Sequence, residues 1–146
     1  MIKRMINWFI NLFKSNKTLY LSEDNLYQWY DAEVELLRLL NLKRKNQLTA
    51  DLNLYYFAKD RTRYLEAYPK SKHDGYFETV HILGDLGFEQ TGECLTLNIK
   101  NTKKIMDSLM KSPSHAKILL DERYKYIGIG YHNAGRKNFT CLILGR

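Results

Sequence analysis

The stretch from Gly92 to His115 limits what this 146-residue chain can fold into more than any other part of it. It begins with Gly92-Glu93-Cys94, continues through a short apolar run and a helical pattern, and ends at Ser112-Pro113-Ser114-His115. Proline stops a helix because it has no backbone N–H and clashes with the preceding turn. The chain is therefore expected to turn back there, so that an imidazole at a helix start faces a carboxylate in a glycine-led turn.

A second histidine lies upstream, in the loop His73-Asp74-Gly75 that follows Pro69. His73, Glu93 and His115 are the only grouping of residues in the sequence that looks like a site. A helix start disfavours the charged imidazolium, so His115 suits a neutral ligand or a base. Two imidazoles and one carboxylate can hold Zn²⁺ with an open position, or orient a general base. The alternative is a hydrogen-bonded polar core without a ligand.

The positive charge of the chain gives little support to nucleic-acid binding. Lysine and arginine number 23 against 16 acidic residues, a net charge of +7. Four of these positive charges, Lys3, Arg4, Lys14 and Lys17, precede the first acid, Glu23. The excess is mainly terminal, and the rest of the chain has no basic run with interleaved aromatic residues. Nucleic acid is therefore not an expected partner.

The two cysteines, Cys94 and Cys141, exclude a disulfide framework and a CxxC metal knuckle. We expect two buried, unreactive thiols, with a single disulfide as the alternative if their strands adjoin. Cys94 is not expected to act as a nucleophile with a histidine, because its side chain and that of its neighbour Glu93 point to opposite sides of an extended chain. A length of 146 residues with 45% hydrophobic content fits one domain. No apolar run approaches the roughly 18 to 20 residues that span a bilayer.

Residues 1–21 form an amphipathic N-terminal segment ahead of a domain at residues 22–146. Trp8, Phe9, Leu12 and Phe13 belong to a wide apolar helical face with basic flanks, which is typical of a helix at a membrane interface. We expect residues 1–18 to contact a membrane surface or a protein partner. Packing on the chain's own domain and an uncleaved signal are the alternatives. No small-residue cleavage site follows the apolar run, so a cleaved signal peptide is not expected.

Helical and extended patterns alternate through the rest of the chain. Helices are predicted from Ser22 to the basic cluster Lys43-Arg44-Lys45-Asn46, from Thr49 to Tyr68, from Tyr76 to Leu86, and after Asn101 up to Ser112. The cations of the basic cluster are expected on a solvated helix end. The inner stripe of the second helix is expected to comprise Leu54, Phe57, Ala58, Arg61, Leu65 and Tyr68.

Strands are predicted at Phe88 to Thr91, Leu95 to Ile99, Tyr124 to Tyr131 and Phe139 to Leu144, with a hairpin turn at Asn133 to Arg136. Gly128 and Gly130 permit another backbone to approach their strand closely. The nearly all-apolar run from Phe139 to Leu144 suits a central strand. This order indicates an α/β or α+β domain with helices on both faces of a small sheet.

From about Asn41 to Arg146 the chain resembles the CAP superfamily, which includes cysteine-rich secretory proteins, antigen 5 and pathogenesis-related proteins, and especially its short bacterial branch. The matching pieces, in chain order, are Asn41-Leu42-Lys43-Arg44, Leu54 to Ala58, His73-Asp74-Gly75, Gly87-Phe88, Gly92-Glu93, Ser112-Pro113-Ser114-His115 and Ile127-Gly128-Ile129-Gly130. The resemblance implies a three-layer α-β-α sandwich with a small, mainly antiparallel sheet. It also implies a central cleft that holds histidines and glutamates.

By position, His73, Glu93 and His115 match that cluster, and Ser112 stands where eukaryotic members carry a second glutamate. The family's Gly-Glu-Asn is Gly92-Glu93-Cys94 here. The resemblance implies a ligand-binding cleft, with Zn²⁺ as a candidate cofactor and a lipid or other apolar compound as a candidate ligand. It also implies an extracellular or cell-envelope location, although the chain has no visible cleavable signal.

Three functions follow as hypotheses. The first is a non-enzymatic binding module that acts at a membrane, cell surface or assembly. The second is a metal-dependent hydrolase that uses His73, Glu93 and His115. The third is a structural component of a larger assembly, such as a virus particle. The first is favoured, because no nucleophile is accompanied by a base and an orienting group.

Overall fold

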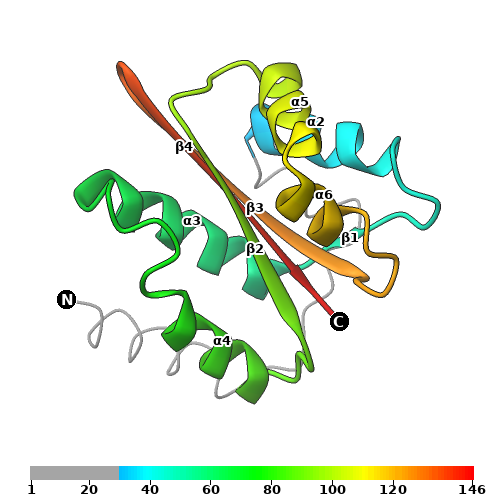
Figure 1. Ribbon diagram of the computed structural model, residues 1–146. Helices are drawn as coiled ribbons and strands as arrows, with labels where there is room; N and C mark the ends of the chain where they lie inside the picture. Colours follow the sequence, from blue (N-terminus) through cyan, green and yellow to red (C-terminus); the bar gives the residue numbers. More distant parts are fainter. Residues whose placement is uncertain (1–29) are drawn as a thin grey trace.

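The computed structural model describes residues 30–146. Predictions for residues 1–29, including the early part of the first helix and the contact residues Trp8, Phe9, Leu12 and Phe13, lie outside the described residues. The described elements, in chain order, are α2 (Asp31–Asn41), β1 (Thr49–Ala50), α3 (Leu52–Ala67), α4 (Tyr76–Asp85), β2 (Thr91–Leu97), α5 (Thr102–Lys111), α6 (Pro113–Leu119), β3 (Tyr126–Ala134) and β4 (Lys137–Gly145). Figure 1 shows how they are arranged.

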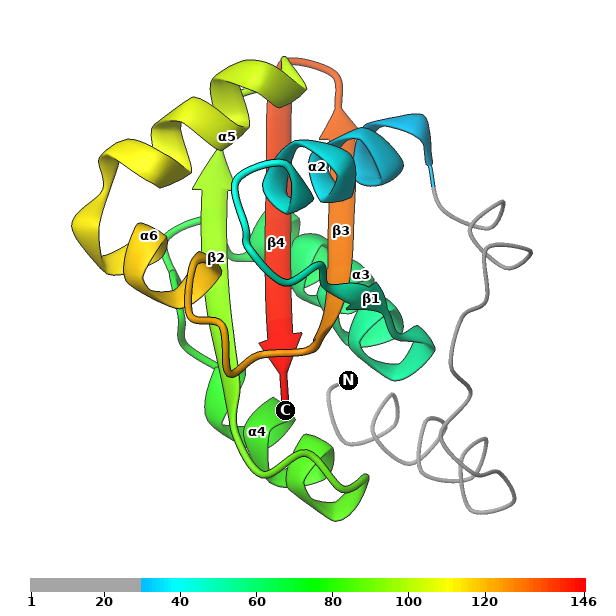
Figure 2. The same cartoon turned by 90° about the vertical axis from the view of Figure 1, so that its right-hand side faces the viewer.

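The four strands form one mixed, mainly antiparallel sheet in the order β1-β3-β4-β2. β4 pairs antiparallel with both β3 and β2, and the short β1 pairs parallel with β3. Figure 2 shows β4 between its two long neighbours. The apolar run from Phe139 to Leu144 is therefore a central strand, as its composition predicted.

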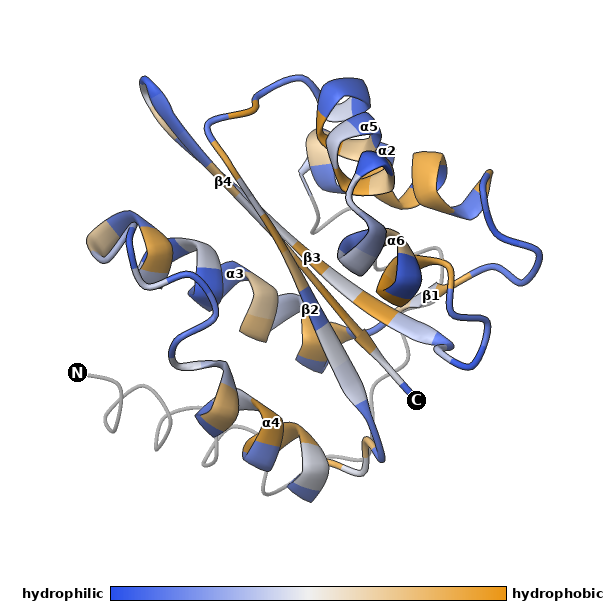
Figure 3. Ribbon diagram, in the orientation of Figure 1, coloured by the Kyte–Doolittle hydropathy of each residue, from blue (hydrophilic) through white to orange (hydrophobic). Residues whose placement is uncertain are grey.

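Helices cover both faces of this sheet, so the predicted α-β-α sandwich is confirmed. α3 and α4 lie on one side, and α2, α5 and α6 lie on the other (Figure 1). One buried cluster lies mainly under α2, α5 and α6 and includes Leu36, Leu40, Cys94, Ile105, Leu109 and Leu142. The other lies under α3 and α4 and includes Leu54, Ala58, Leu83, Cys141 and Ile143. Figure 3 shows apolar residues along the strands and hydrophilic residues in most loops.

α3 packs unusually close to β3, as the two strand glycines predicted. A Cβ atom at Gly128 would lie 1.9 Å from the carbonyl carbon of Leu54, and one at Gly130 would lie 2.4 Å from the carbonyl oxygen of Ala58. Only glycine leaves room for helix backbone at these distances. This contact sets the position of α3, and with it Arg61, over the sheet.

The prediction that Glu93 lies in a glycine-led turn is wrong. β2 runs unbroken from Thr91 to Leu97, and Glu93 pairs with Ile143 in the middle of it. Gly92 has a packing role instead, because a Cβ atom there would lie 2.7 Å from Cγ2 of Ile118 in α6. A close helix contact, and not a turn, explains this glycine.

The start of α3 also differs from the prediction. Thr49 and Ala50 form β1, paired with Tyr126 and Ile127, instead of opening the helix. Asp51 is the N-cap, and its Oδ1 accepts a hydrogen bond from the Leu54 N–H at 3.0 Å. The helix therefore begins after Asp51, and the two residues before Asp51 pair with a strand from much later in the chain.

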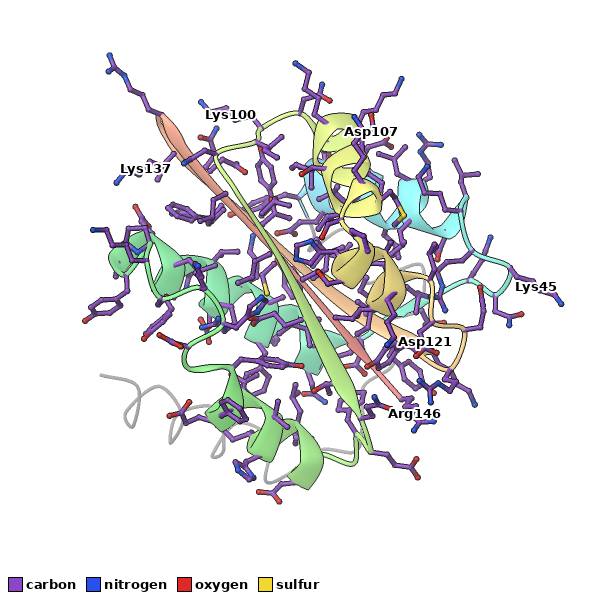
Figure 4. All side chains as sticks on the ribbon, in the orientation of Figure 1. Lys45, Lys100, Asp107, Asp121, Lys137 and Arg146 are labelled. Carbon is purple, nitrogen blue, oxygen red and sulfur yellow. The ribbon has the colours of Figure 1, made fainter. Side chains whose placement is uncertain are left out.

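Two surface assignments were wrong. Arg44, predicted to lie on a solvated helix end, is 7% exposed. It donates hydrogen bonds to the carbonyls of Leu119 and Tyr124, so it ties the end of α2 to the loop before β3. Tyr68, assigned to the inner side of α3, is 53% exposed. By contrast, Lys45, Lys100 and Lys137 project from the periphery (Figure 4).

Candidate functional site

A buried ion pair joins α3 to the middle of β2. Arg61 Nε donates to Glu93 Oε2 at 2.7 Å, and Arg61 Nη2 donates to Glu93 Oε1 at 3.0 Å. The two side chains are 5% and 1% exposed. The Cys141 thiol also donates to Oε2, at 3.7 Å. Both carboxylate oxygens are thus engaged by fixed donors, in the bidentate geometry that makes arginine–carboxylate pairs strong.

Burial lowers the pKa of Arg61, but its hydrogen bonds to Glu93 and its electrostatic interactions, mainly with Glu93, together outweigh burial and raise the pKa. The remaining donors of the guanidinium hold the loop that precedes α4. Nη1 donates to the Asp74 carbonyl and Nη2 donates to the Lys72 carbonyl, each at 2.9 Å. Lys72 has a φ of 51°, in the left-handed region that few side chains adopt. Arg61 therefore stabilises a loop conformation that would otherwise be disfavoured.

His73 sits at the centre of this loop and faces the same carboxylate. Its Nδ1 lies 2.9 Å from Glu93 Oε1. An ionised carboxylate can only accept hydrogen bonds, so Nδ1 carries the proton, and Nε2 of a neutral ring is left as an acceptor. The side chain is 54% exposed, and no group in residues 30–146 is hydrogen-bonded to Nε2. Arg61, Glu93 and His73, which we call the polar cluster, thus present one oriented imidazole edge at the surface.

His115 approaches the cluster from the other layer. It lies in the first turn of α6, and its backbone carbonyl accepts a hydrogen bond from the Cys94 thiol at 3.9 Å. Burial lowers the pKa of His115, and electrostatic interaction with His73 lowers it further. The two imidazoles are therefore close enough to interact, and the direction agrees with the neutral form expected from the sequence. The structure thus joins His73 to Glu93, whereas His115 is linked to them only by its electrostatic interaction with His73. The grouping of all three as one site stays a prediction.

Ser112 is the fourth residue assigned to this cleft. It precedes α6 as its N-cap, and its hydroxyl lies 3.2 Å from that of Ser114. Within the described part of the chain, no hydrogen bond joins Ser112 to Glu93 or His73. Its place in the cleft stays a prediction. Ser112 is the residue directly before the first turn of α6.

The arrangement of these residues does not fit a zinc site. Among residues 30–146, no group of three or more His, Cys, Asp and Glu side chains is placed to hold a metal ion together. Both Glu93 oxygens are already engaged by Arg61, whose positive charge would also repel a cation. That leaves two imidazoles, whereas catalytic zinc sites have three protein ligands. Zinc binding stays a prediction from the sequence.

Sequence reasoning missed Arg61 as a member of the cluster. It was assigned to the inner face of its helix among Leu54, Ala58 and Leu65, which are all fully buried. A charged residue on such a face needs a buried partner of opposite charge, and that signal could have identified it. A second missed contact is the Tyr76 hydroxyl, which donates to the Thr91 hydroxyl at 2.7 Å and joins α4 to β2.

The cysteines confirm the expectation of buried thiols. Both are free and buried. Burial raises the pKa of Cys94 to about 12, with a further contribution from Glu93, and burial also raises that of Cys141. Because the thiolate is the reactive form, neither is suited to be a nucleophile.

The layered fold, with this cluster at its edge strand β2, defines a three-layer α-β-α domain (Figure 1). Solved structures support this fold. An extracellular protein from Bacillus anthracis that contains an SCP domain matches with a TM-score of 0.71 and 19% identity, over 86% of this chain and 44% of that one. An outer surface protein from Borrelia burgdorferi matches with a TM-score of 0.66 and 18% identity, over 88% of this chain and 98% of that one. A cysteine-rich secretory protein from Staphylococcus aureus matches with a TM-score of 0.64 and 16% identity, over 79% and 38% of the two chains.

At these identities the likeness shows the fold alone, and the chain spans less than half the length of the Bacillus protein. No curated protein sequence matches this chain. The model of the CAP family, described as the cysteine-rich secretory protein family, matches residues 32–143. The chain therefore belongs to the CAP family.

Proposed function

We propose that this chain is a non-enzymatic CAP module that binds a ligand at a membrane or cell surface through His73 and its neighbours. The observation that carries this proposal is the state of Glu93, whose two oxygens are held by Arg61 while His73 bonds to one of them. A carboxylate held in this way orients the imidazole and is poorly placed to remove a proton from a substrate. In this proposal His73 is held in one orientation and recognises the ligand.

The chemistry of this surface favours a ligand with a hydrogen-bond donor. In the neutral ring, Nε2 of His73 accepts, and the lowered pKa of His115 favours a second neutral imidazole beside it. A hydroxyl-bearing lipid or another mainly apolar compound with one polar end satisfies both groups. The cluster offers no activated nucleophile that would support cleavage of such a ligand.

In this proposal the site of action is extracellular or at the cell envelope. Two of the structural relatives are described as an extracellular protein and an outer surface protein. Within residues 30–146, none of the helices has the length and apolar character needed to cross a bilayer. Membrane contact is therefore assigned to residues 1–18, through Trp8, Phe9, Leu12 and Phe13.

Co-sedimentation with vesicles of mixed neutral and anionic phospholipid tests the membrane contact. The full chain should sediment with the vesicles, and a chain beginning at Ser22 should remain in solution. A full-length variant with Phe9→Asp and Phe13→Asp is the matched control, because it keeps the basic residues. Equal partitioning of all three proteins would contradict a membrane contact through this segment.

Mass spectrometry of an organic extract from the native protein tests the binding role. A compound that copurifies with the parent should be reduced in His73→Ala and retained in His81→Ala, since His81 is exposed on α4. Equal amounts in both variants would remove His73 as a recognition group.

A further inference from the structure

α4 has an apolar outer face that nothing in residues 30–146 covers. Its inner face is buried through Thr79 and Leu83. On the opposite side, Phe77 is 81% exposed and Val80 is 37% exposed. A Cβ atom at Gly84 would meet nothing within 4 Å. Phe77, Val80, His81 and Gly84 are all exposed and follow one another at helical spacing, so they form a single, mainly apolar stripe, which we call the α4 outer face.

Phe77 gives this face unusual apolar character. It is the most exposed large hydrophobic residue in the described part of the chain. Gly84 adds open space one turn beyond Val80, where a bulky side chain of a partner can approach the helix backbone. An aromatic and a β-branched side chain beside such a gap suit an apolar, aromatic-rich partner.

The charges around the face select the partner further. Glu78 and Asp85 are exposed on α4, and Glu89 is exposed just beyond it. Acidic neighbours disfavour an anionic lipid surface and favour a partner with basic residues beside its apolar face. The expected occupant is therefore a basic, aromatic amphipathic segment.

We propose that residues 1–18 of this same chain dock on the α4 outer face. This segment carries Trp8, Phe9, Leu12 and Phe13 on its apolar face and has no acidic residue. Its basic residues are Lys3, Arg4, Lys14 and Lys17. It thus matches the α4 outer face in both apolar character and charge.

The length of the intervening chain permits this contact. Residues 19–29 can extend to about 36 Å. A domain of the size of residues 30–146 has a diameter of roughly 35 Å. A path over the surface to the opposite side measures roughly 55 Å, half the circumference. Residues 19–29 supply about 36 Å of it and a helix over residues 1–18 would add up to about 27 Å, so the segment can reach α4 without any rearrangement of the fold.

Docking has a consequence for the proposed function. The apolar face that packs against Phe77 is the face assigned above to membrane contact. One segment cannot use it for both, so a membrane has to compete with α4 for residues 1–18. The competition rests on the proposed function, whereas docking in the absence of a membrane does not.

Tryptophan fluorescence without lipid tests the docking. The chain has two tryptophans, Trp8 and Trp29, so Trp29→Phe makes Trp8 the only indole reporter. In that protein Trp8 should show blue-shifted emission and protection from acrylamide, relative to the urea-unfolded chain. Adding Phe77→Asp should abolish both effects. The change should leave the fold intact, because Phe77 makes few contacts at 81% exposure.

The matched control is Leu42→Asp, which introduces the same charge at a residue 71% exposed, at the end of α2 in the other layer. It should leave the Trp8 emission unchanged. Solvent-exposed Trp8 in the Trp29→Phe protein, or emission indifferent to Phe77→Asp, would overturn the proposal. So would a dimer in light scattering whose Trp8 protection is lost on dilution, because the occupant would then be a second copy. Failure of vesicle binding alone leaves the docking result standing.

Discussion

Two ion pairs lie in the interior of the part of the protein that the structure describes. Arg61 and Glu93 form one buried pair, and Lys59 and Glu33 form another, in which Glu33 is fully buried. Glu33 also accepts a hydrogen bond from the Tyr131 N–H at 2.9 Å, so it links α2 to β3. A buried ion costs several kcal/mol to desolvate and is tolerated only with complete hydrogen bonding. These pairs therefore fix how the layers fit together.

Replacement of Arg61 by leucine should lower the free energy of unfolding by about 3–5 kcal/mol, because it leaves Glu93 buried without its partner. It should also release the Lys72 and Asp74 carbonyls and so loosen the loop that carries His73. Urea unfolding at neutral pH measures the loss. The exposed pair Arg38–Glu35 supplies the control, and Arg38→Leu should leave the urea midpoint nearly unchanged, because water already solvates both charges.

A second variant separates the charge effect from lost packing. Combining Arg61→Leu with Glu93→Leu removes both ions, so the double variant should be more stable than Arg61→Leu alone. A double variant as unstable as the single one would mean that packing and loop contacts, and not the unpaired carboxylate, account for the loss.

At the scale of single residues, the sequence predicts the positions that depend only on neighbouring residues in the chain. His73 and His115 stand beside glycine or proline, where loops and helix starts can be recognised. The pairing of Arg61 with Glu93 spans 32 positions and depends on where α3 lies over the sheet. No local pattern carries that information.

Among the elements, α3 is the one whose position matters most to the cluster. Its closeness to β3 comes from Gly128 and Gly130, and it brings Arg61 within reach of β2. α6 reaches β2 from the other layer through Gly92. Three strand glycines thus determine the distances between the layers near the cluster.

Gly128→Ala should therefore destabilise the protein by about 3 kcal/mol or more, because the new methyl group would meet backbone atoms that cannot move aside. Gly84→Ala is the matched control. It lies in α4 with open space around it, and alanine should raise stability by about 0.5–1 kcal/mol through its helix preference. Urea unfolding compares the two. Equal effects of both substitutions would show that α3 is not held against β3 as closely as described.

Prediction of the elements succeeded where the signal was local. The side chain of Asn101 caps α5 by accepting a hydrogen bond from the Lys104 N–H at 3.0 Å, as its position before an amphipathic run indicated. β1 was missed, since its two residues are a strand only because Tyr126 and Ile127 lie beside them. Gly92 was assigned to a turn because a lone sequence cannot distinguish a turn glycine from one that admits a neighbouring helix.

The two cysteines bear on the molecule as a whole, because both lie in the sheet but each faces a different helical layer. β2 and β4 are neighbours, with Cys94 opposite Leu142 and Leu95 opposite Cys141. Side chains alternate between the faces of a sheet, so the two thiols point away from each other. Cys94 belongs to the cluster under α2, α5 and α6, and Cys141 belongs to the cluster under α3 and α4. A disulfide between Cys94 and Cys141 was the alternative if their strands adjoin. It is excluded, because the two side chains lie on opposite faces of the sheet.

This placement makes thiol labelling a test of cooperativity. Both cysteines are 0% exposed, so a water-soluble disulfide reagent should label neither in the folded protein. Both helical layers pack on the same sheet. Opening one layer exposes an apolar face of that sheet and should destabilise the sheet for the other layer as well. Cys94→Ala and Cys141→Ala each leave a single thiol. In each variant, the urea concentration at half-maximal labelling should coincide with the midpoint of unfolding of that same variant, as expected for a two-state domain. Labelling of Cys141 well below its unfolding midpoint, with Cys94 still protected up to its own, would mean that α3 and α4 open separately. The Arg61–Glu93 pair that joins α3 to β2 would then be too weak to hold the layers together.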